Sequence, residues 1–331
     1  MIDAGKLNVA GGLRCEREAL KVQIEATALD PGSSRSQNNL RRSYGRICLA
    51  LWNLGQIDAA LPLCDKSLEL GKDERIDGFS ALNTAFGHAL YSSYQTALGD
   101  PTRAAREMAA AERFFGVMKT SGAAARSLAH VNAFIATYRG EIALMTGGAI
   151  EWQKSRSDVE QAIAERIATF GGAAPNAVAA QALSGDHASA AELALALKDF
   201  AGAEAHAKKS LNYGGADDSL SLRQQADLND IRAILATALA RQGKFDEAKQ
   251  ALQPALAYLK LPLVMQTDDE TMKYWNARVL LAAAIANSNQ PAEKARFFAE
   301  ATKRFDAMPA TLKRLKSYAM LREQIAAGGQ R

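Results

Sequence analysis

The chain has 331 residues, of which 48% are hydrophobic and 7% aromatic, and its formal charge is +4 with both signs scattered along the sequence. Nucleic-acid-binding proteins concentrate basic charge in a patch, so this composition argues against nucleic acid as a partner. The longest apolar run, Val279 to Ala286, is far too short to span a bilayer, and no secretory signal opens the sequence. We therefore expect a cytoplasmic protein that neither binds nucleic acid nor crosses a membrane.

The hydrophobic periodicity predicts helices throughout and no strands. Residues 1–12 contain glycine and are expected to form a flexible N-terminus, and 33–39 read as a polar linker after a helix that Asp30-Pro31-Gly32 ends. The predicted helices are 13–29, 40–54, 57–70, 76–98, 102–119, 123–145, 150–170, 175–197, 201–212, 220–241, 245–259, 271–286, 292–305 and 311–327.

The stretch 229–259 has the clearest pattern. Before the turn at Gly243, apolar residues recur at three- and four-residue spacing from Ile231 to Leu239, and after it they recur from Ala248 to Leu259. Each helix therefore carries one apolar stripe. Neither stripe can be buried alone, so the two helices are expected to pack as an antiparallel pair that needs neighbouring pairs.

Similar units recur along the chain. The residues Gly243-Lys-Phe-Asp-Glu-Ala248 are matched by Gly55 to Ala60, by Gly99-Asp100 before Ala104, and by Lys198-Asp199-Phe200 before Ala203. Weaker copies are expected around Ala19 and Ala295, and a degenerate copy around Gly147-Gly148. These spacings resemble the second half of a tetratricopeptide (TPR) repeat, in which small residues let paired helices approach closely.

The resemblance implies an all-α solenoid, an α-α superhelix of TPR-like antiparallel helix pairs over residues 13–305, with a capping segment at 306–331. Four of the five intervals between the packing alanines are 41 to 47 residues, and the fifth, of 99 residues, is interpreted as two repeats. These units are therefore roughly ten residues longer than the ~34 residues of a standard repeat. Such long-repeat arrays resemble regulatory TPR modules of bacterial multidomain proteins.

The last predicted helix, 311–327, carries a wide apolar face with Lys313 and Lys316 opposite. Its apolar residues are Leu312, Leu315, Tyr318, Ala319, Leu321 and Ile325. A terminal repeat needs a cover for its stacking surface, so a capping helix is the simplest interpretation. The alternative is a helix that lies on a membrane surface.

Three cysteines form no CxxC pair and leave an odd count, which argues against a disulfide framework. Cys48 and Cys64 fall where the repeat needs small buried residues, and we expect both to be core thiols. The acidic trio Asp268-Asp269-Glu270 is expected to cap the helix that follows it rather than to bind a metal.

The sequence has no motif that indicates catalysis or a cofactor. Phosphate-binding and dinucleotide-binding glycine loops are absent, as are H-E-x-x-H and the G-x-S-x-G elbow. No two of the four histidines lie three or four residues apart, so no helix presents a metal-binding pair; His88 and His187 are expected to be packing residues. We predict a non-enzymatic protein without a cofactor.

In TPR proteins the ligand contacts come mostly from the first helix of each repeat. Transferred to this chain, the pattern predicts a partner-binding concave face that comprises Arg42, Arg46, Trp52, Asn53, Glu192, Asp230, Thr237 and Arg241, with Tyr138 and Arg139 from the degenerate repeat. Trp152 and Trp275 are expected to pack in the core. Arg42 and Arg46 lie one helical turn apart and can converge on one carboxylate. They resemble part of a carboxylate clamp, although Gly45 and Leu49 stand where that clamp has lysine and asparagine.

These expectations favour a protein–protein interaction scaffold that binds a peptide or a partner helix in its concave groove. The alternative is a sensor module of a larger signalling protein, in which the groove encloses a small ligand or a short peptide. A polar groove would favour the scaffold, and a closed apolar cavity would favour the sensor.

Overall fold

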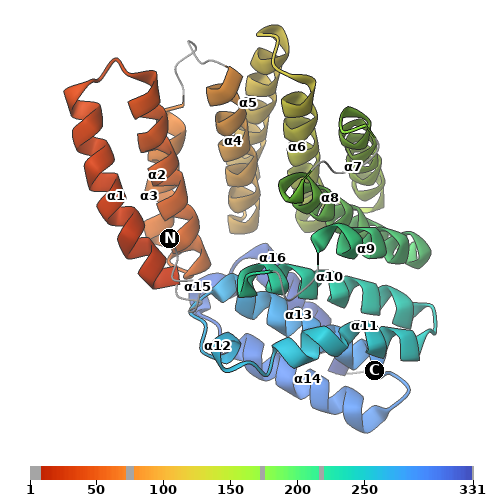
Figure 1. Ribbon diagram of the computed structural model, residues 1–331. Helices are drawn as coiled ribbons and strands as arrows, with labels where there is room; N and C mark the ends of the chain where they lie inside the picture. The colour runs from red at the N-terminus through yellow and green to blue at the C-terminus, as the bar shows by residue number, and fades with distance from the viewer. Residues whose placement is uncertain (1–8, 72–77, 172–175, 216–219, 330–331) are drawn as a thin grey trace. The chain divides into compact units, whose positions relative to one another are not determined.

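The computed structural model describes residues 9–71, 78–171, 176–215 and 220–329, and all regular secondary structure in these ranges is α-helical (Figure 1). The helices are α1 Val9–Leu29, α2 Ser34–Asn53, α3 Ile57–Glu69, α4 Gly78–Leu98, α5 Pro101–Thr120, α6 Ala125–Thr146, α7 Ala149–Thr169, α8 Ala177–Ala196, α9 Phe200–Gly214, α10 Leu222–Arg241, α11 Phe245–Tyr258, α12 Pro262–Met265, α13 Glu270–Ala286, α14 Pro291–Asp306, α15 Ala310–Lys313 and α16 Lys316–Gly329.

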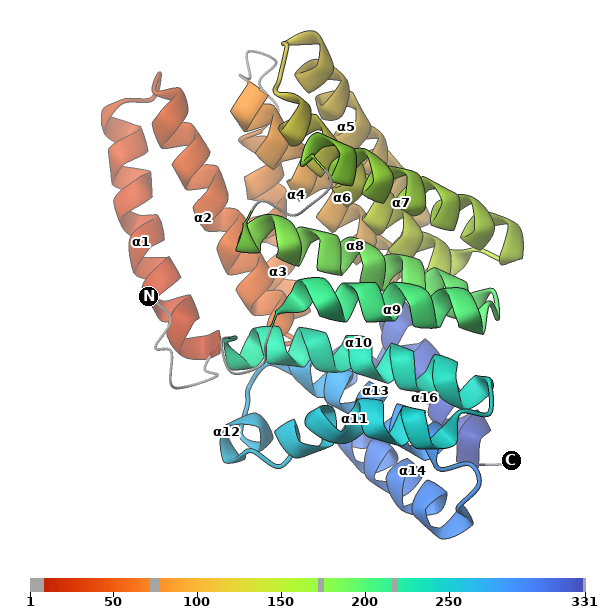
Figure 2. The same cartoon turned by 45° about the vertical axis from the view of Figure 1, so that its right-hand side comes forward.

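The chain divides into two compact units. Unit 1 comprises Met1–Ile135 with Asp268–Glu270, and unit 2 comprises Ala136–Thr267 with Thr271–Arg331. In unit 1, α1 packs on α2, α2 on α3 and α4 on α5. In unit 2, α8 to α11 lie side by side in chain order (Figure 2). The predicted all-α architecture of antiparallel helix pairs is confirmed.

Four of the pairs share one type of turn. Gly55, Gly99 and Gly243 have φ values of 69°, 85° and 80°, and Lys198 occupies the same place between α8 and α9 with φ 62°. A left-handed residue after a helix lets the next N–H groups bond back to the last carbonyls. This turn reverses the chain in three or fewer residues, so consecutive helices pack antiparallel.

The second helix of each pair repeats one packing register. Ala60, Ala104, Ala203 and Ala248 are each the fourth residue of their helix and at most 4% exposed. In α11 the eighth and eleventh residues, Leu252 and Ala255, are buried in the same way. Side chains without bulk at these positions permit close helix packing, which confirms the predicted role of the alanines in these four helices.

The two weaker copies were placed in the wrong register. Ala19 and Ala295 are exposed. In α14 the eighth, eleventh and fifteenth residues are Phe298, Ala301 and Phe305, and all three are buried. Lys294 therefore stands where other repeats have the packing alanine. The two long helices predicted around Gly147-Gly148 are confirmed as α6 and α7.

Two boundary predictions near the N-terminus also differ from the structure. Residues 1–8 lie outside the described part of the chain, but α1 already begins at Val9. The predicted linker 33–39 is mostly the first turns of α2, because the Ser33 side chain accepts a hydrogen bond from the Ser36 N–H and caps the helix. Polar residues mark a helix start as readily as a loop.

Cys48 and Cys64 are joined by a disulfide, so the prediction of free thiols is wrong. Both side chains are buried, as predicted, but they face each other across the α2–α3 pair with Cα atoms 5.3 Å apart. That separation lies within the range that a disulfide spans. An odd cysteine count carries no information about which residues an antiparallel packing brings together; Cys15 is the exposed third cysteine.

The acidic trio lies at the starts of two helices rather than one. The Asp268 carboxylate accepts hydrogen bonds from the N–H groups of Val9 and Ala10, at 2.9 and 3.0 Å. It therefore neutralises the first turn of α1, more than 250 residues away in the chain. Glu270 lies in the first turn of α13, as predicted for the helix that follows the trio.

The C-terminal segment covers the last repeat. Five residues of the predicted apolar face are at most 7% exposed: Leu312, Leu315, Tyr318, Leu321 and Ile325. α16 packs on α14, so this face is buried in protein and the capping interpretation is confirmed. The predicted single helix is divided into α15 and α16 by a turn at Arg314 and Leu315.

Candidate ligand-binding surface

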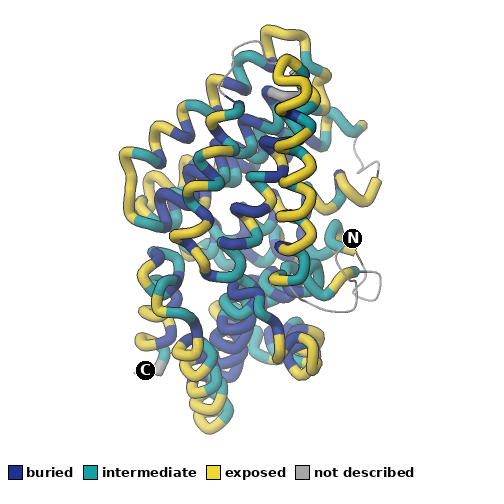
Figure 3. Tube along the Cα trace, turned by 90° about the vertical axis from the view of Figure 1, so that its left-hand side faces the viewer, coloured by how far each residue is buried: buried dark blue, intermediate teal, exposed yellow. Residues whose placement is uncertain are grey.

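On α2, one stripe remains accessible after packing. Arg42, Arg46 and Leu49 are exposed and Asn53 is half-buried, at spacings of four, three and four residues, whereas Ile47, Cys48 and Leu51 point into the core. A helix packed on both sides keeps such a stripe for solvent or ligand. In the other helices, buried and exposed residues likewise alternate along the helix, so that one face is buried and another is accessible (Figure 3).

Arg46 lies at the edge of this stripe. Its Nη1 is 3.7 Å from Glu16 Oε1 on α1, and its side chain is 57% exposed. An ion pair that exposed contributes little to stability. The arginine can therefore exchange Glu16 for a carboxylate of a partner at small cost.

Trp52 turns away from the accessible stripe. Its ring stacks on that of Tyr94 from α4, with centroids 3.7 Å apart and planes 3° from parallel. Trp52 is half-buried and packs against the unit 1 core. The structure thus places Trp52 between the first helices of two pairs, where it packs against Tyr94.

A buried arginine adds positive charge beside the stripe. Arg41 is 6% exposed and donates hydrogen bonds to Thr84 Oγ1 (2.9 Å) and Asn38 Oδ1 (2.6 Å), both neutral groups. Burial, together with the neighbouring Arg42 charge, lowers the Arg41 pKa to about 10. The guanidinium remains charged at neutral pH, so α2 presents a positive potential around Arg42.

In unit 2, Arg278 of α13 joins the first helices of three pairs. Its Nη2 lies 2.5 Å from Glu192 Oε1 on α8, and its Nη1 lies 3.1 Å from Asp230 Oδ2 on α10. The guanidinium also lies 5.9 Å from the centroid of the Tyr274 ring. We call Glu192, Asp230, Tyr274 and Arg278 the Arg278 cluster. Two of the predicted site residues, Glu192 and Asp230, are thereby brought together.

Negative charge exceeds positive charge in this cluster. Burial raises the Asp230 pKa to about 7; Arg278 opposes this shift, and Glu192 and Asp227 add to it. Burial disfavours the charged form of Arg278, but Asp230 and Glu192 outweigh that effect and raise its pKa. Burial therefore dominates the shift of Asp230, whereas the two carboxylates dominate that of Arg278.

The cluster lies on accessible stripes. Between Ala226 and Ala240 of α10, only Asp227, Asp230, Arg232 and Thr237 are not buried. Three of these four share one face of the helix, which the exposed Arg241 continues. Thr237 is half-buried and its hydroxyl donates to the Ala233 carbonyl at 2.8 Å. Thr237 and Arg241 therefore extend the predicted surface without belonging to the cluster.

The residues predicted from the degenerate repeat lie on α6. Tyr138 is half-buried and Arg139 is exposed. Burial raises the pKa of the Tyr274 hydroxyl to about 12; Arg278 opposes the shift, and the charges of Asp230, Glu192 and Glu141 of α6 add to it. Trp152 is half-buried, and its Nε1 donates to the Ala143 carbonyl at 2.8 Å.

Arg278 and Tyr274 were missed in the sequence analysis, although the repeat register could have indicated the arginine. Arg42, Asp230 and Arg278 are each the ninth residue of a first helix.

Trp275, which was expected to pack in the core, is half-buried. The guanidinium of Arg223 from α10 lies 4.5 Å from the centroid of its ring.

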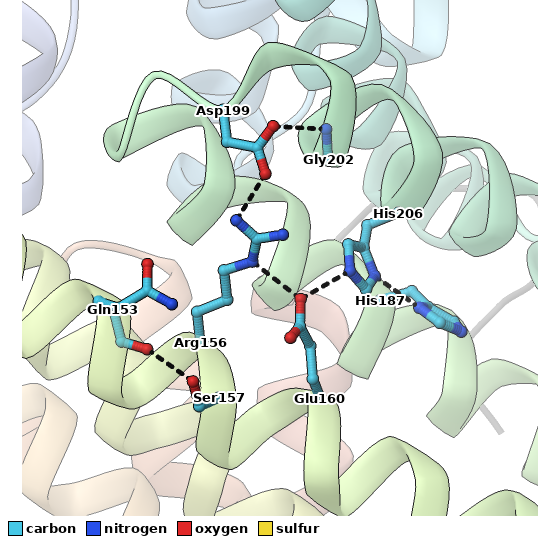
Figure 4. A network of polar contacts seen from close by, with 8 residues as sticks. All are labelled: Gln153, Arg156, Ser157, Glu160, His187, Asp199, Gly202 and His206. Atoms are coloured by element: carbon cyan, nitrogen blue, oxygen red, sulfur yellow. Dashed lines mark hydrogen bonds and ion pairs between the residues drawn. The ribbon is translucent and has the colours of Figure 1, made fainter.

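A second polar network joins α7, α8 and α9 (Figure 4). His187 and His206 meet through their Nδ1 atoms at 3.0 Å, and His206 Nε2 lies 3.1 Å from Glu160 Oε1. Arg156 binds Glu160 (2.8 Å) and Asp199 (2.7 Å), the residue that caps α9. Burial lowers the His187 pKa to about 4, with the neighbouring His206 and Lys209 charges adding to the shift. His187 and His206 lie on different helices, so their spacing in the sequence did not indicate that they meet.

Within the described ranges, no group of three or more His, Cys, Asp or Glu side chains is arranged to hold a metal ion. Among the described helices, none has the length and hydropathy that crossing a membrane requires.

The recurring register of packing residues and left-handed turns decides the architecture. This is a TPR-like helical-repeat protein. No family model and no curated protein matches the TPR-like chain. BtubC (BKLC) from P. vanneervenii is a similar solved structure, with 14% identity, a TM-score of 0.47 and coverage of 76% of this chain and 90% of its own.

Two further solved structures are similar. PilF of Pseudomonas aeruginosa has 14% identity, a TM-score of 0.46 and coverage of 87% of this chain and 99% of its own. The TPR domain of P58(IPK) has 13% identity and a TM-score of 0.17, with coverage of 97% and 96%. Because all three TM-scores are below 0.5, the TPR-like assignment rests on the helix pairs themselves.

Proposed function

We propose that this chain is a non-enzymatic protein–protein interaction scaffold, and that the accessible stripes of its first helices bind a polypeptide segment. The observation that carries the proposal is the shared ninth position. Arg42, Asp230 and Arg278 occupy it on three first helices, and each is a charged side chain that retains access to solvent. Charged groups repeated along accessible stripes favour a polar, extended ligand.

In unit 1, the complementary ligand is acidic. Arg42 and Arg46 are exposed one helical turn apart, and the buried Arg41 adds its charge from beneath. Charge-assisted hydrogen bonds to carboxylates are stronger than neutral ones. Helices fixed by packing on both sides present these groups with little reorganisation, which lowers the entropic cost of binding.

The sensor alternative would need a cavity that encloses its ligand. The groove between α14 and α16 has a volume of about 350 Å³ and is open to solvent, with Phe298, Phe305 and Ile325 among its lining residues. This open groove gives the sensor no support, and the charged residues repeated on the first helices favour the scaffold.

The proposal can be tested with a random peptide library displayed on phage and selected on the immobilised full chain. We expect enrichment of acidic peptides that bind through unit 1, and a loss of at least about fivefold in their affinity in R42E/R46E, because reversal of two charges costs on the order of 1–3 kcal/mol. The matched control is R106E/R113E, which reverses two exposed arginines on α5, a second helix.

Circular dichroism would show that both double variants retain helicity. Equal affinity for wild type and R42E/R46E would remove α2 from the binding surface. A library from which no peptide is enriched on the wild-type chain would contradict the scaffold function.

A further inference from the structure

His187 of α8 and His206 of α9 form a pair inside the contact between these two helices. Their Nδ1 atoms lie 3.0 Å apart, which is hydrogen-bond distance, and His187 is only 2% exposed. The His187 ring also stacks on that of Tyr213 from α9, with centroids 5.7 Å apart. Glu160 of α7 lies on the other side of His206 (Figure 4). Packing therefore holds the two Nδ1 atoms facing each other.

The partners of His206 decide which ring nitrogens carry hydrogen. Its Nε2 lies 3.1 Å from Glu160 Oε1, and the same oxygen accepts a hydrogen bond from Arg156 Nε at 2.8 Å. An ionised carboxylate only accepts hydrogen bonds, so His206 Nε2 carries a hydrogen. In the neutral ring the His206 Nδ1 is then an acceptor, and the Nδ1–H of His187 donates to it.

The pair can hold one positive charge but not two. A proton taken up by His206 leaves its Nδ1–H donating to a neutral His187, with Glu160 beside the new charge. When both rings are protonated, each Nδ1 carries a hydrogen and neither can accept. Two N–H groups of like charge cannot face each other at 3.0 Å, so the second proton breaks the contact.

Charged and titratable groups surround the pair on the elements that pack against it. They are Glu160 and Arg156 of α7, Lys209 and Tyr213 of α9, and Asp199 at the cap of α9.

Other charged groups nearby face different partners. Asp186, beside His187 on α8, faces Arg166 of α7 at 2.6 Å. Lys244, from the turn that joins α10 to α11, faces Glu204 of α9 at 2.8 Å. Glu160 therefore supplies counter-charge for one proton on the histidine pair.

The pKa values of the two histidines agree with this geometry. Burial lowers the His187 pKa to about 4, and His206 and Lys209 add to the shift. Burial also lowers the His206 pKa, but there Glu160 opposes the shift. As the pH falls, His206 therefore gains its proton first and His187 gains the second. The contact is complete above about pH 6.5, the ordinary histidine pKa, and is lost as the pH falls toward 4.

We infer that the His187–His206 pair is an acid-operated switch, which joins α8 to α9 while it carries at most one positive charge and separates the two helices at this turn when both rings are protonated. Ser184 and Ser210 join the same helices one turn away, where the Ser184 hydroxyl donates to the Ser210 carbonyl at 2.9 Å. That uncharged contact does not titrate, so the opening is local.

The opening acts on a first helix with an accessible stripe. α8 also carries Glu192, which faces Arg278 at 2.5 Å. Displacement of α8 would therefore change the surface that unit 2 presents to a ligand. This consequence rests on the proposed scaffold function, whereas the switch itself does not.

The protonation order can be read by nitrogen-15 NMR of the full chain labelled at its four histidines, with H187F and H206F assigning the two resonances. Between pH 8 and pH 4 we expect His206 to gain its proton first and His187 to stay neutral down to about pH 5. E160Q should move the protonation of His206 to lower pH, because it removes the carboxylate that favours the charged ring.

The opening itself needs a local measurement. Burial raises the Asp186 pKa to about 6, so that group takes up a proton more readily in the folded chain and offsets part of the effect on global stability. Hydrogen exchange followed by mass spectrometry resolves α8 and α9 separately from other helices. Their protection factors should fall roughly tenfold or more between pH 6 and pH 4, as expected for a histidine pKa displaced from about 6.5 to about 4.

Matched phenylalanine variants separate the switch from general acid sensitivity. H187F keeps an aromatic ring against Tyr213 and removes the titrating group, so α8 and α9 should keep their protection at pH 4. H130F replaces a histidine of α6 that lies against Phe86, and it should lose protection in α8 and α9 as wild type does.

The wild-type measurements alone can refute the switch if H187F fails to fold. Two histidines that gain protons independently near pH 6.5, or protection of α8 and α9 that is constant down to pH 4, would overturn the inference. So would an acid-induced loss of protection that persists in H187F. None of these results depends on peptide binding, so the scaffold function would stand or fall separately.

Discussion

Arg278 and Asp230 occupy the same position, the ninth residue, on the first helices α13 and α10, and their side chains meet at 3.1 Å. Neighbouring repeats thus place equivalent residues in contact, and here these residues carry opposite charge. Glu192 contacts the same guanidinium from the sixteenth position of α8. One arginine therefore fixes three first helices to one another.

Removal of this cation should destabilise the protein. In R278M, Glu192 and Asp230 lose their shared partner, and uncompensated charge in a partly buried site is costly. We expect a loss of about 1–3 kcal/mol in the free energy of unfolding at pH 8, measured by urea denaturation. The loss should be smaller at pH 5, where Asp230 is protonated; an equal loss at both values would contradict the assigned charge state.

Lys198 should be replaceable with a gain in stability. It is the one non-glycine residue with positive φ in the described part of the chain, at 62°, and the equivalent turns use glycine. K198G should raise the free energy of unfolding by about 0.5–1 kcal/mol, because glycine adopts this conformation without a steric penalty. G243A, at φ 80°, is the reciprocal variant and should lower the free energy of unfolding. A lower free energy of unfolding in K198G would refute the assignment of the turn.

The Cys48–Cys64 disulfide should contribute measurably to unit 1. It closes a loop with a sequence separation of 16 residues, for which the chain-entropy model gives roughly 3 kcal/mol. Reduction of the wild-type protein should therefore lower its thermal midpoint, and C15S, which lacks only the exposed cysteine, should respond identically. A midpoint insensitive to reductant, with three free thiols in the wild type or two in C15S by mass spectrometry, would contradict the pairing. A disulfide is more typical of an oxidising compartment than of the cytoplasm that the sequence predicts.

His187 should make the protein sensitive to acid. Its folded-state pKa of about 4 lies below the ordinary value near 6.5, so the unfolded chain binds the proton more readily than the folded one does. Stability from this group is complete above pH 6.5 and is lost as the pH falls toward 4, by about 1–3 kcal/mol. H187F should flatten the pH dependence of the unfolding free energy in that window, whereas H130Q should not. A profile unchanged by H187F would contradict the buried neutral state.

The sequence was sufficient for the architecture because the signals were local. Turn glycines, fourth-position alanines and apolar stripes are all spaced within one helix pair, so Ala60 and Ala248 could be assigned from spacing alone. The register of α14 was wrong because Lys294 replaces the marker alanine. Phe298, Ala301 and Phe305 follow the burial pattern of the other second helices, although the fourth residue does not.

The contacts between helices could not be predicted in the same way. Asp268 caps α1 from the distant end of the chain, and Cys48 meets Cys64 across a helix pair. His187 and His206 likewise converge from two helices. Position within a helix identified Glu192 and Asp230 as accessible, but only packing shows that Arg278 joins them and that Trp52 stacks on Tyr94.

Photo-crosslinking tests the central claim most directly. A benzophenone amino acid placed at Leu49 or Arg241, on the accessible stripes of α2 and α10, should crosslink to a library-selected peptide, and the same group at Arg106 of α5 or Glu247 of α11 should not. Crosslinks confined to the second helices, or equal at all four positions, would contradict a scaffold that binds through its first helices.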